Sequence, residues 1–262
     1  LSSQPPPSSL SPQVSVLSSQ LSSLSSQLST LKSQSSALTS QLSALSPHLS
    51  ALSPQLSALS PQPSPLSPQP SPLPMSLVQT DYDTLKACLD KFARQLPSVE
   101  ATGKMIVERL RAGKTIFACG NGGSATDSMH LCEELVGRYR GNRRPLPAVS
   151  LNTDTSVLTC IGNDYGFDEI FSRQIEALGK TDDILVGFST SGNSENVARA
   201  FSTAKQKGVT TILLAGKDGG KLKKIADHTI IVESENTARI QELHTFILHA
   251  WLELVEAENW EV

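Results

Sequence analysis

The chain has 262 residues and a net charge of −3, but its composition changes sharply near residue 75. Residues 1–74 hold 26 Ser, 16 Leu, 13 Pro and one charged side chain, Lys32, whereas all 16 Gly and all 25 Asp and Glu fall in residues 75–262. This division excludes a single globular domain of 262 residues, and the 21 basic and 25 acidic side chains of residues 75–262, a net charge of −4, disfavour a nucleic-acid-binding surface.

The low-complexity segment, residues 1–74, carries a repeat of seven residues in which Leu follows the spacing of a coiled coil. Its composition opposes a stable helix: Ser is a mediocre helix former, no charged residues guide pairing, and Pro47, Pro54 and Pro61 each cost about 3 kcal/mol inside a helix. We expect at best a weak helix over residues 14–45, a disordered remainder, and no catalytic residue in this segment.

Targeting signals are weak throughout the chain. The longest apolar runs are far shorter than the roughly 18 residues of a membrane span, and no basic region precedes an apolar stretch as in a signal peptide. The four cysteines form no CxxC pair and lie in apolar contexts such as residues 116–119. We expect reduced thiols in the core of a cytoplasmic protein, with Met75 near the start of the folded part.

Short apolar runs alternate with helical patterns in residues 75–262, the predicted folded domain. Two helices are predicted first, at about 80–95 and 98–112, and a long apolar helix is predicted last, over Thr237–Glu258. The runs predict five buried strands: Thr115–Cys119, Ala148–Leu151, Ile184–Ser189, Thr210–Ala215 and Thr229–Val232. This alternation is typical of a three-layer α/β sandwich with a five-stranded parallel sheet.

Two predicted strands run into loops of small and hydroxyl residues, Gly120–Ser124 and Ser189–Ser194, each followed by a helix. The free backbone N–H groups and the dipole at a helix N-terminus favour an anion there. Helix capping with a tight turn explains one such loop equally well, but two in one sheet favour a sugar-phosphate site. Neither loop matches the P-loop motif, and Gly120–Gly123 matches the dinucleotide motif only in part.

Two pairs of polar residues lie on predicted helices. His130 and Glu134 are four residues apart and share one helix face. Gln241 and His249 are eight residues apart in the last helix, about 12 Å along its axis. Taken alone, the HxxxE spacing favours a solvated or salt-bridged face over a metal site, because it lacks the context of the HExxH motif.

Several long stretches resemble the sugar isomerase (SIS) domain family, and more narrowly the phosphoheptose isomerases. The resemblance covers residues 80–258, and residues 1–74 resemble nothing in that family. The stretches are GNGGSATDSMHLCEELVGRY (120–139), NTDTSVLTCIGNDYGFDEIFSRQIEAL (152–178), STSGNSENV (189–197), GKDGG (216–220) and ARIQELHTFILH (238–249).

The resemblance implies an aldose–ketose isomerase that converts sedoheptulose 7-phosphate to D-glycero-D-manno-heptose 7-phosphate through an enediolate. It implies Glu134 and His249 as the acid–base pair and, in some members, Zn²⁺ on His130, Glu134, Gln241 and His249. It also implies a homotetramer with active sites at subunit interfaces. The substrate-binding residues that it implies are Asn121, Gly122, Gly123, Ser124, Glu134, Asn163, Asp164, Ser189, Thr190, Ser191, Ser194 and Gln241.

Some assignments keep an alternative. Asn163 and Asp164 also suit an ordinary Asx turn in the loop after residue 161. His244 has no role to carry over from the family, so we expect a packed or interfacial histidine.

Three other functions compete with catalysis. They are a non-catalytic SIS adaptor that binds a replication initiator, a phosphosugar-sensing regulator, and a structural protein built on the repeat. Because such adaptors lack the carboxylate and the final histidine, Glu134 and His249 favour the enzyme.

Overall fold

The computed structural model describes residues 22–35, 39 and 75–261. The chain divides between Pro72 and Leu73 into two units, which are described separately. Residues 22–35 form an exposed helix inside the span where a weak helix is predicted. The predicted disorder of the rest of the low-complexity segment lies outside the described residues, and the predicted domain boundary at residues 74/75 stays a prediction.

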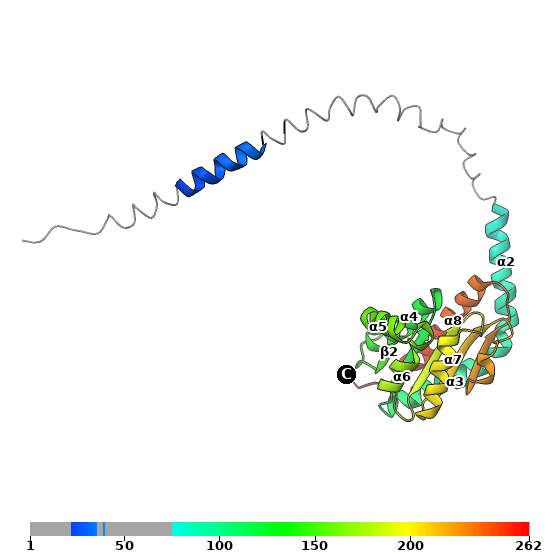
Figure 1. The fold of residues 1–262 in the computed structure, drawn as a ribbon. Coiled ribbons are helices and arrows are strands. Elements are labelled where there is room, and N and C mark those ends of the chain that lie inside the picture. Colours follow the sequence, from blue (N-terminus) through cyan, green and yellow to red (C-terminus); the bar gives the residue numbers. More distant parts are fainter. Residues whose placement is uncertain (1–21, 36–38, 40–74, 262) are drawn as a thin grey trace, which may run out of the picture. The chain divides into compact units, whose positions relative to one another are not determined.

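Residues 75–261 form the predicted three-layer sandwich around a parallel sheet (Figure 1). The strand order is β2-β1-β3-β4-β5, and each predicted strand matches an observed one to within one residue at either end. Because β1 and β3 are buried along their whole length, their sequences are continuous apolar runs rather than alternating ones. The strands are β1 (Ile116–Gly120), β2 (Ala148–Ser150), β3 (Ile184–Ser189), β4 (Thr210–Gly216) and β5 (His228–Val232).

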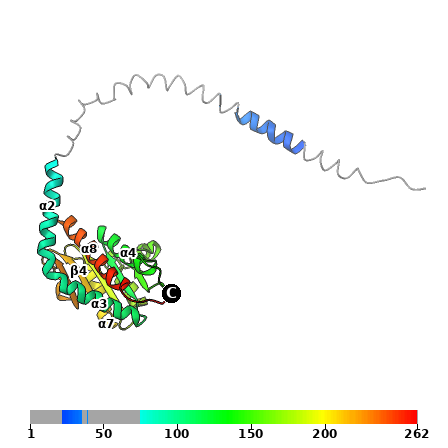
Figure 2. The same cartoon turned by 180° about the vertical axis from the view of Figure 1, so that it is seen from behind.

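Helices cover both faces of the sheet and form two separate apolar cores (Figures 1 and 2). One face is covered by α2 (Met75–Phe92), α3 (Leu96–Arg111), α4 (Gly123–Val136) and α8 (Thr237–Glu256). The other is covered by α5 (Thr155–Asp164), α6 (Ser172–Leu178) and α7 (Glu195–Gln206). Short 3₁₀ turns occupy Ala93–Gln95, Phe167–Glu169 and Leu222–Lys224.

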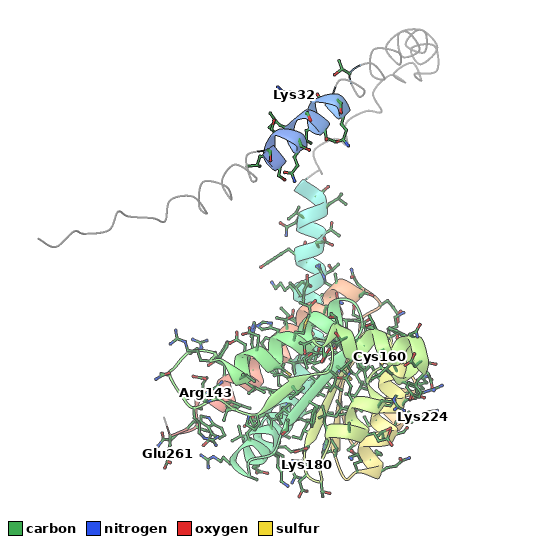
Figure 3. All side chains as sticks on the ribbon, turned by 60° about the vertical axis from the view of Figure 1, so that its left-hand side comes forward. Lys32, Arg143, Cys160, Lys180, Lys224 and Glu261 are labelled. Atoms are coloured by element: carbon green, nitrogen blue, oxygen red, sulfur yellow. The ribbon has the colours of Figure 1, made fainter. Side chains whose placement is uncertain are left out.

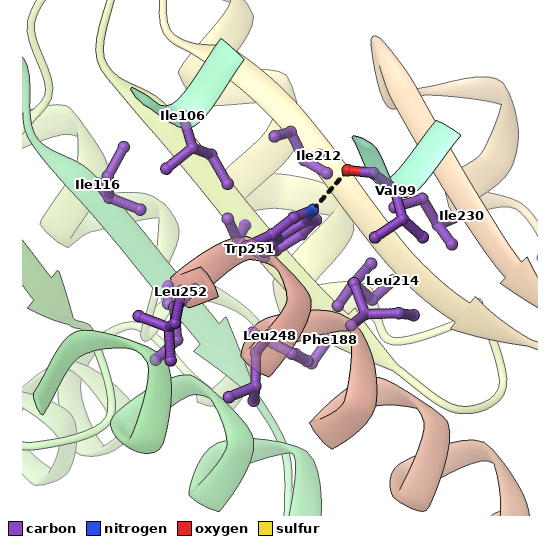
Figure 4. Close-up of a cluster of buried hydrophobic side chains, with 14 of the residues drawn as sticks. Val99, Ile106, Ile116, Phe188, Ile212, Leu214, Ile230, Leu248, Trp251 and Leu252 are labelled. Atoms are coloured by element: carbon purple, nitrogen blue, oxygen red, sulfur yellow. Dashed lines mark hydrogen bonds between the residues drawn. The ribbon is translucent and has the colours of Figure 1, made fainter. Parts of the chain in front are cut away.

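Trp251 fixes α8 against α3 in the larger core (Figure 4). Its side chain is fully buried, and its indole N–H donates to the Val99 carbonyl at 3.0 Å and to Thr102 Oγ1 at 3.1 Å. Gly103 leaves room for the indole, since a Cβ there would lie 2.8 Å from Trp251 Cδ1. Replacing a buried Trp by Ala costs about 3–5 kcal/mol, so this contact fixes the helix that carries His249.

The cysteines follow the prediction in three of four cases. Cys88, Cys119 and Cys132 are buried free thiols, and burial raises the pKa of Cys132 to about 12. Cys160 is exposed (Figure 3), so its prediction as a core thiol is wrong. The reason is that α5 lies at the periphery of the domain and buries only Ile161.

The described part of the chain contains no helix with the length and apolar character needed to cross a membrane.

Candidate active site

The strand order places a crevice between β1 and β3. From β1 the chain passes to β2 at one edge of the sheet, returns to β3 on the other side of β1, and then continues outward to β5. Parallel α/β sheets bind ligands where this reversal occurs, beyond the carboxyl ends of the strands. The loops 120–124 and 189–194 follow β1 and β3, so they flank this crevice.

The first loop turns at Gly122, whose φ of 57° lies in the left-handed region that favours glycine. The Ser124 and Ala125 N–H groups donate to the carbonyls of Asn121 and Gly122, at 3.1 and 3.0 Å. Gly122 and Gly123 are exposed, whereas Ser124 is only 3% exposed. The glycine backbone, rather than the Ser124 side chain, therefore forms the accessible surface of this loop.

A pair of amides joins the first loop to the first turn of α7. The Asn121 and Asn196 side chains exchange two hydrogen bonds, each of 2.9 Å, and Asn196 is buried. Asn121 was predicted from the sequence, but Asn196 was not. The pair holds the two sides of the crevice in a defined relative position.

The second loop brings hydroxyls together at the start of α7. Ser189 Oγ and Ser194 Oγ lie 2.9 Å apart, and Thr190 and Ser191 are partly exposed beside them. Small hydroxyl side chains at a helix N-terminus form a site suited to an anion such as a phosphate.

The turn after β4 supports this second loop. The Leu222 N–H donates to the Gly192 carbonyl at 2.9 Å, and Gly192 has a φ of 65°. A Cβ on Gly192 would overlap the Gly219 carbonyl group, and one on Gly220 would lie 2.5 Å from the Gly192 carbonyl oxygen. The stretch Gly216–Gly220 thus acts as a backbone support for the hydroxyl loop.

Helices α4 and α8 lie side by side and run parallel, so that His130 and Glu134 of α4 lie close to His249 of α8. Near the start of α4, the Gln241 amide packs against Gly123. Farther along, Thr245 Oγ1 donates to Asp127 Oδ1 at 3.4 Å, and the His249 ring then meets His130. Gln241 therefore lies at the start of α4, next to the sheet, whereas His249 lies about two turns farther along α4.

The far end holds the predicted acid–base pair. His130 Nε2 lies 3.5 Å from Glu134 Oε1, and the rings of His130 and His249 meet edge to face at 5.0 Å. Burial and the neighbouring His130 lower the pKa of His249, while Glu134 and Glu253 act in the opposite direction. A lowered pKa keeps the imidazole neutral near pH 7, which is the form that accepts a proton.

The same end of the face has the donor atoms of a metal site. One donor atom each from His130, Glu133 and Glu134 lie within 4.8 Å of one another, and the His249 imidazole is adjacent. Imidazole and carboxylate are zinc ligands, so the residues fit the ion. Glu133 was not predicted, and Gln241, which was, lies beside Gly123 instead.

Asp127 is a buried carboxylate that the sequence analysis missed. It is 8% exposed, and its Oδ2 atom has no hydrogen-bond partner in the structure. Burial raises the pKa of Asp127 to about 6, although Thr245 and His130 act in the opposite direction. Its spacing of three and seven residues from His130 and Glu134 puts it on the same helix face, and that periodicity was the available signal.

Arg143 is a second residue that the sequence analysis missed (Figure 3). Its guanidinium donates to the carbonyls of Glu134 at 2.6 Å and Leu135 at 2.9 Å, at the end of α4. It also pairs with Glu256 of α8 at 3.0 Å, and both side chains are largely buried. Arg143 therefore ties the residue predicted as the base to the helix that carries His249.

The structure corrects the predicted position of Asn163 and Asp164. Asn163 and Asp164 are the last two residues of α5, so their placement in a loop is wrong: a helix that the Asp154 side chain caps extends through them. They are exposed and hydrogen-bonded to each other at 2.7 Å.

His244 is fully buried against Phe188, and burial lowers its pKa to about 4, which confirms the packed alternative.

Sequence and structure comparisons agree with this fold and arrangement. The family model for the SIS domain matches residues 82–216. The phosphoheptose isomerase of Geobacter sp. (strain M21) is 52% identical over 162 residues, which are 62% of this chain and 84% of the relative. That of Helicobacter pylori (strain P12) is 46% identical over 181 residues, 69% of this chain and 94% of the relative.

The solved phosphoheptose isomerase from Neisseria gonorrhoeae superposes with a TM-score of 0.67 at 38% identity, covering 70% of this chain and 99% of that one. The fold and the paired loops thus define a SIS domain. The chain belongs to the SIS family and, within it, to the phosphoheptose isomerases, which are sugar phosphate isomerases. The non-catalytic alternatives are accordingly not favoured.

Proposed function

We propose that this chain interconverts sedoheptulose 7-phosphate and D-glycero-D-manno-heptose 7-phosphate. The observation that carries the proposal is the meeting of His130, Glu134 and His249 between α4 and α8, in a domain whose crevice is flanked by two anion-suited loops. The names of the relatives support the same substrate class.

In this proposal the second loop holds the phosphate. The hydroxyls of Thr190, Ser191 and Ser194 and the N-terminus of α7 bind its oxygens, and the buried Ser189 hydroxyl positions Ser194. The glycine backbone of the first loop, with Asn121, Asn163, Asp164 and Gln241, lines the open-chain sugar. Binding energy from the phosphate, far from the reacting carbons, positions C1 and C2.

Glu134 removes the proton from C1 of the ketose and returns a proton to C2. The electron pair of the broken C–H bond forms the C1–C2 double bond of an enediolate. Neutral His249 transfers protons between the O1 and O2 atoms. His130, Glu133 and Glu134 would hold a zinc ion beside His249, and its positive charge would stabilise the negative oxygen.

The active site is shared between copies of this chain in a homotetramer. Gly123 and Glu134 are eleven residues apart on one helix, so they lie about 16 Å apart along its axis. A heptose phosphate is too short to place its phosphate at the loops and its C1 at Glu134 of the same chain. The phosphate loop of one copy and the acid–base pair of another therefore form one site. Four free cysteines are consistent with a reducing compartment, and we place the enzyme in the cytoplasm.

The function is tested by incubating the full chain with sedoheptulose 7-phosphate and following formation of the aldoheptose phosphate. Glu134→Gln and His249→Ala each lower kcat at least 100-fold while the thermal unfolding midpoint stays within a few degrees. Glu176→Gln changes an exposed glutamate of α6, on the other face of the sheet, and is the control that retains activity. Near-normal turnover in Glu134→Gln or His249→Ala contradicts the assignment.

Site sharing is tested by mixing two inactive variants, Glu134→Gln and the double variant Ser189→Ala/Ser194→Ala, after dissociation and reassembly. In mixed oligomers about a quarter of the sites combine an intact loop with an intact base, so activity returns. If each site lies within one chain, the mixture stays as inactive as its components.

A further inference from the structure

The His249 imidazole has no hydrogen bond or ion pair with any other described residue, and two aromatic rings are what define its orientation. His130 meets it edge to face, and Tyr139 stacks against it with ring centroids 5.7 Å apart and an angle of 26° between the planes. A proton-transferring imidazole without hydrogen bonds depends on packing for its position, and a misplacement of about 1 Å costs about 100-fold in rate.

Tyr139 itself contacts two successive turns of α8. Its ring lies on His249, and its hydroxyl donates to Glu253 Oε1, one helical turn farther on, at 3.3 Å. Arg140 pairs with the same Glu253 and lies 5.1 Å from the centre of the Tyr139 ring. The ring is therefore fixed by neighbours on both its face and its edge.

The loop that carries Tyr139 is anchored to the same two helices. Two residues beyond Tyr139, the Gly141 N–H donates to Glu256 at 2.9 Å, and Glu256 also accepts from the buried Arg143 guanidinium. Arg143 in turn holds the last carbonyls of α4. Tyr139 thus lies in a short loop whose position is fixed relative to both Glu134 and His249.

We propose that Tyr139 is a positioning residue for His249: its ring holds the imidazole in the plane required for proton transfer. The inference rests on the proposed isomerase function, in which His249 transfers protons between substrate oxygens. The ring, rather than the hydroxyl, carries this role, because the ring is what contacts the imidazole. The role requires no contact between Tyr139 and the sugar, so it affects kcat rather than KM.

The test compares Tyr139→Leu with Tyr139→Phe in the full chain. Tyr139→Leu removes the stacked ring and lowers kcat 10- to 100-fold with KM within threefold of wild type. Tyr139→Phe keeps the stacked ring, so its kcat stays within threefold of the wild-type value. The control Tyr82→Leu removes an exposed tyrosine of α2 and leaves both constants unchanged.

A second measurement does not depend on activity. In protein labelled with ¹³C at its five histidines, the His249 ring protons are identified by their loss in His249→Gln. The stacked ring shifts these signals, so they move in Tyr139→Leu and stay close to the wild-type position in Tyr139→Phe.

Unchanged kcat in Tyr139→Leu, equal losses in the Leu and Phe variants, or His249 signals that do not move in Tyr139→Leu would each overturn the proposal. If the wild-type chain has no isomerase activity, the proposed function fails, but the His249 signals still report whether Tyr139 orients the ring.

Discussion

Replacing Arg143 by Ala tests how the end of α4 is held against α8. The substitution leaves the Glu256 carboxylate without its charged partner, although the Gly141 N–H still donates to it. The carbonyls of Glu134 and Leu135 lose the guanidinium donors, and Leu135 keeps only the Leu146 N–H. The Arg143 and Glu256 side chains are only 4% and 13% exposed, so solvent replaces these interactions poorly.

The expected cost follows from this burial. Removing one partner of a buried ion pair costs about 3–5 kcal/mol, because the remaining charge stays in a medium that solvates it badly. For a domain of this size each kcal/mol lowers the thermal unfolding midpoint by about 2–4 °C. A loss of about 4 kcal/mol therefore predicts a midpoint about 8–16 °C lower. Arg143→Lys keeps the charge but not the fork of donors, and it gives an intermediate loss.

Arg140→Ala is the matched control in the same loop. Arg140 also pairs with a glutamate of α8, Glu253, but the two side chains are 65% and 49% exposed. An exposed pair is worth about 0–1 kcal/mol, so the midpoint falls by no more than about 4 °C. Calorimetry of both variants at one protein concentration measures the two unfolding midpoints. Equal losses in the two variants would refute the reasoning from burial.

Three further predictions concern the rest of the site. Gly192→Ala forces a Cβ into the Gly219 carbonyl and raises KM at least 10-fold in the isomerase assay, whereas Gly113→Ala, at a φ of 70° but in open space, leaves KM unchanged. The raised pKa of Asp127 means that its contribution to stability is present below about pH 4 and lost as pH rises through 6. Asp127→Asn therefore increases the free energy of unfolding more at pH 8 than at pH 4, by at most about 3 kcal/mol, and equal changes at both pH values contradict this. Elemental analysis of protein purified without added metal shows about one zinc per chain, and full activity without bound metal would exclude zinc from the site.

The sheet was predictable because its central strands are buried on both faces. β3, for example, begins and ends at the predicted residues, Ile184 and Ser189. The end of α5 was not predictable in the same way. Glycines and Asx residues around Asn163 favour a turn, but the Asp154 cap and the packing of Ile161 extend the helix to Asp164.

In the candidate site, too, some residues were predictable from the sequence and others were not. His130 and Glu134 follow from the helical spacing of four, which is local information. The partners of Tyr139 and Arg143 depend on how α4 docks on α8, more than a hundred residues later in the chain. No periodic pattern in a loop predicts such a contact, so these residues are found only from the folded structure.

The pairing of Asn121 with Asn196 constrains how this sequence can drift. Each amide supplies one donor and one acceptor to the other, so the two positions, 75 residues apart, satisfy each other without any charge. An aspartate at either position would lose a donor and would put a negative charge beside the loops that attract anions. The two asparagines are therefore expected to change together or to persist, even in descendants that have altered the sugar they accept.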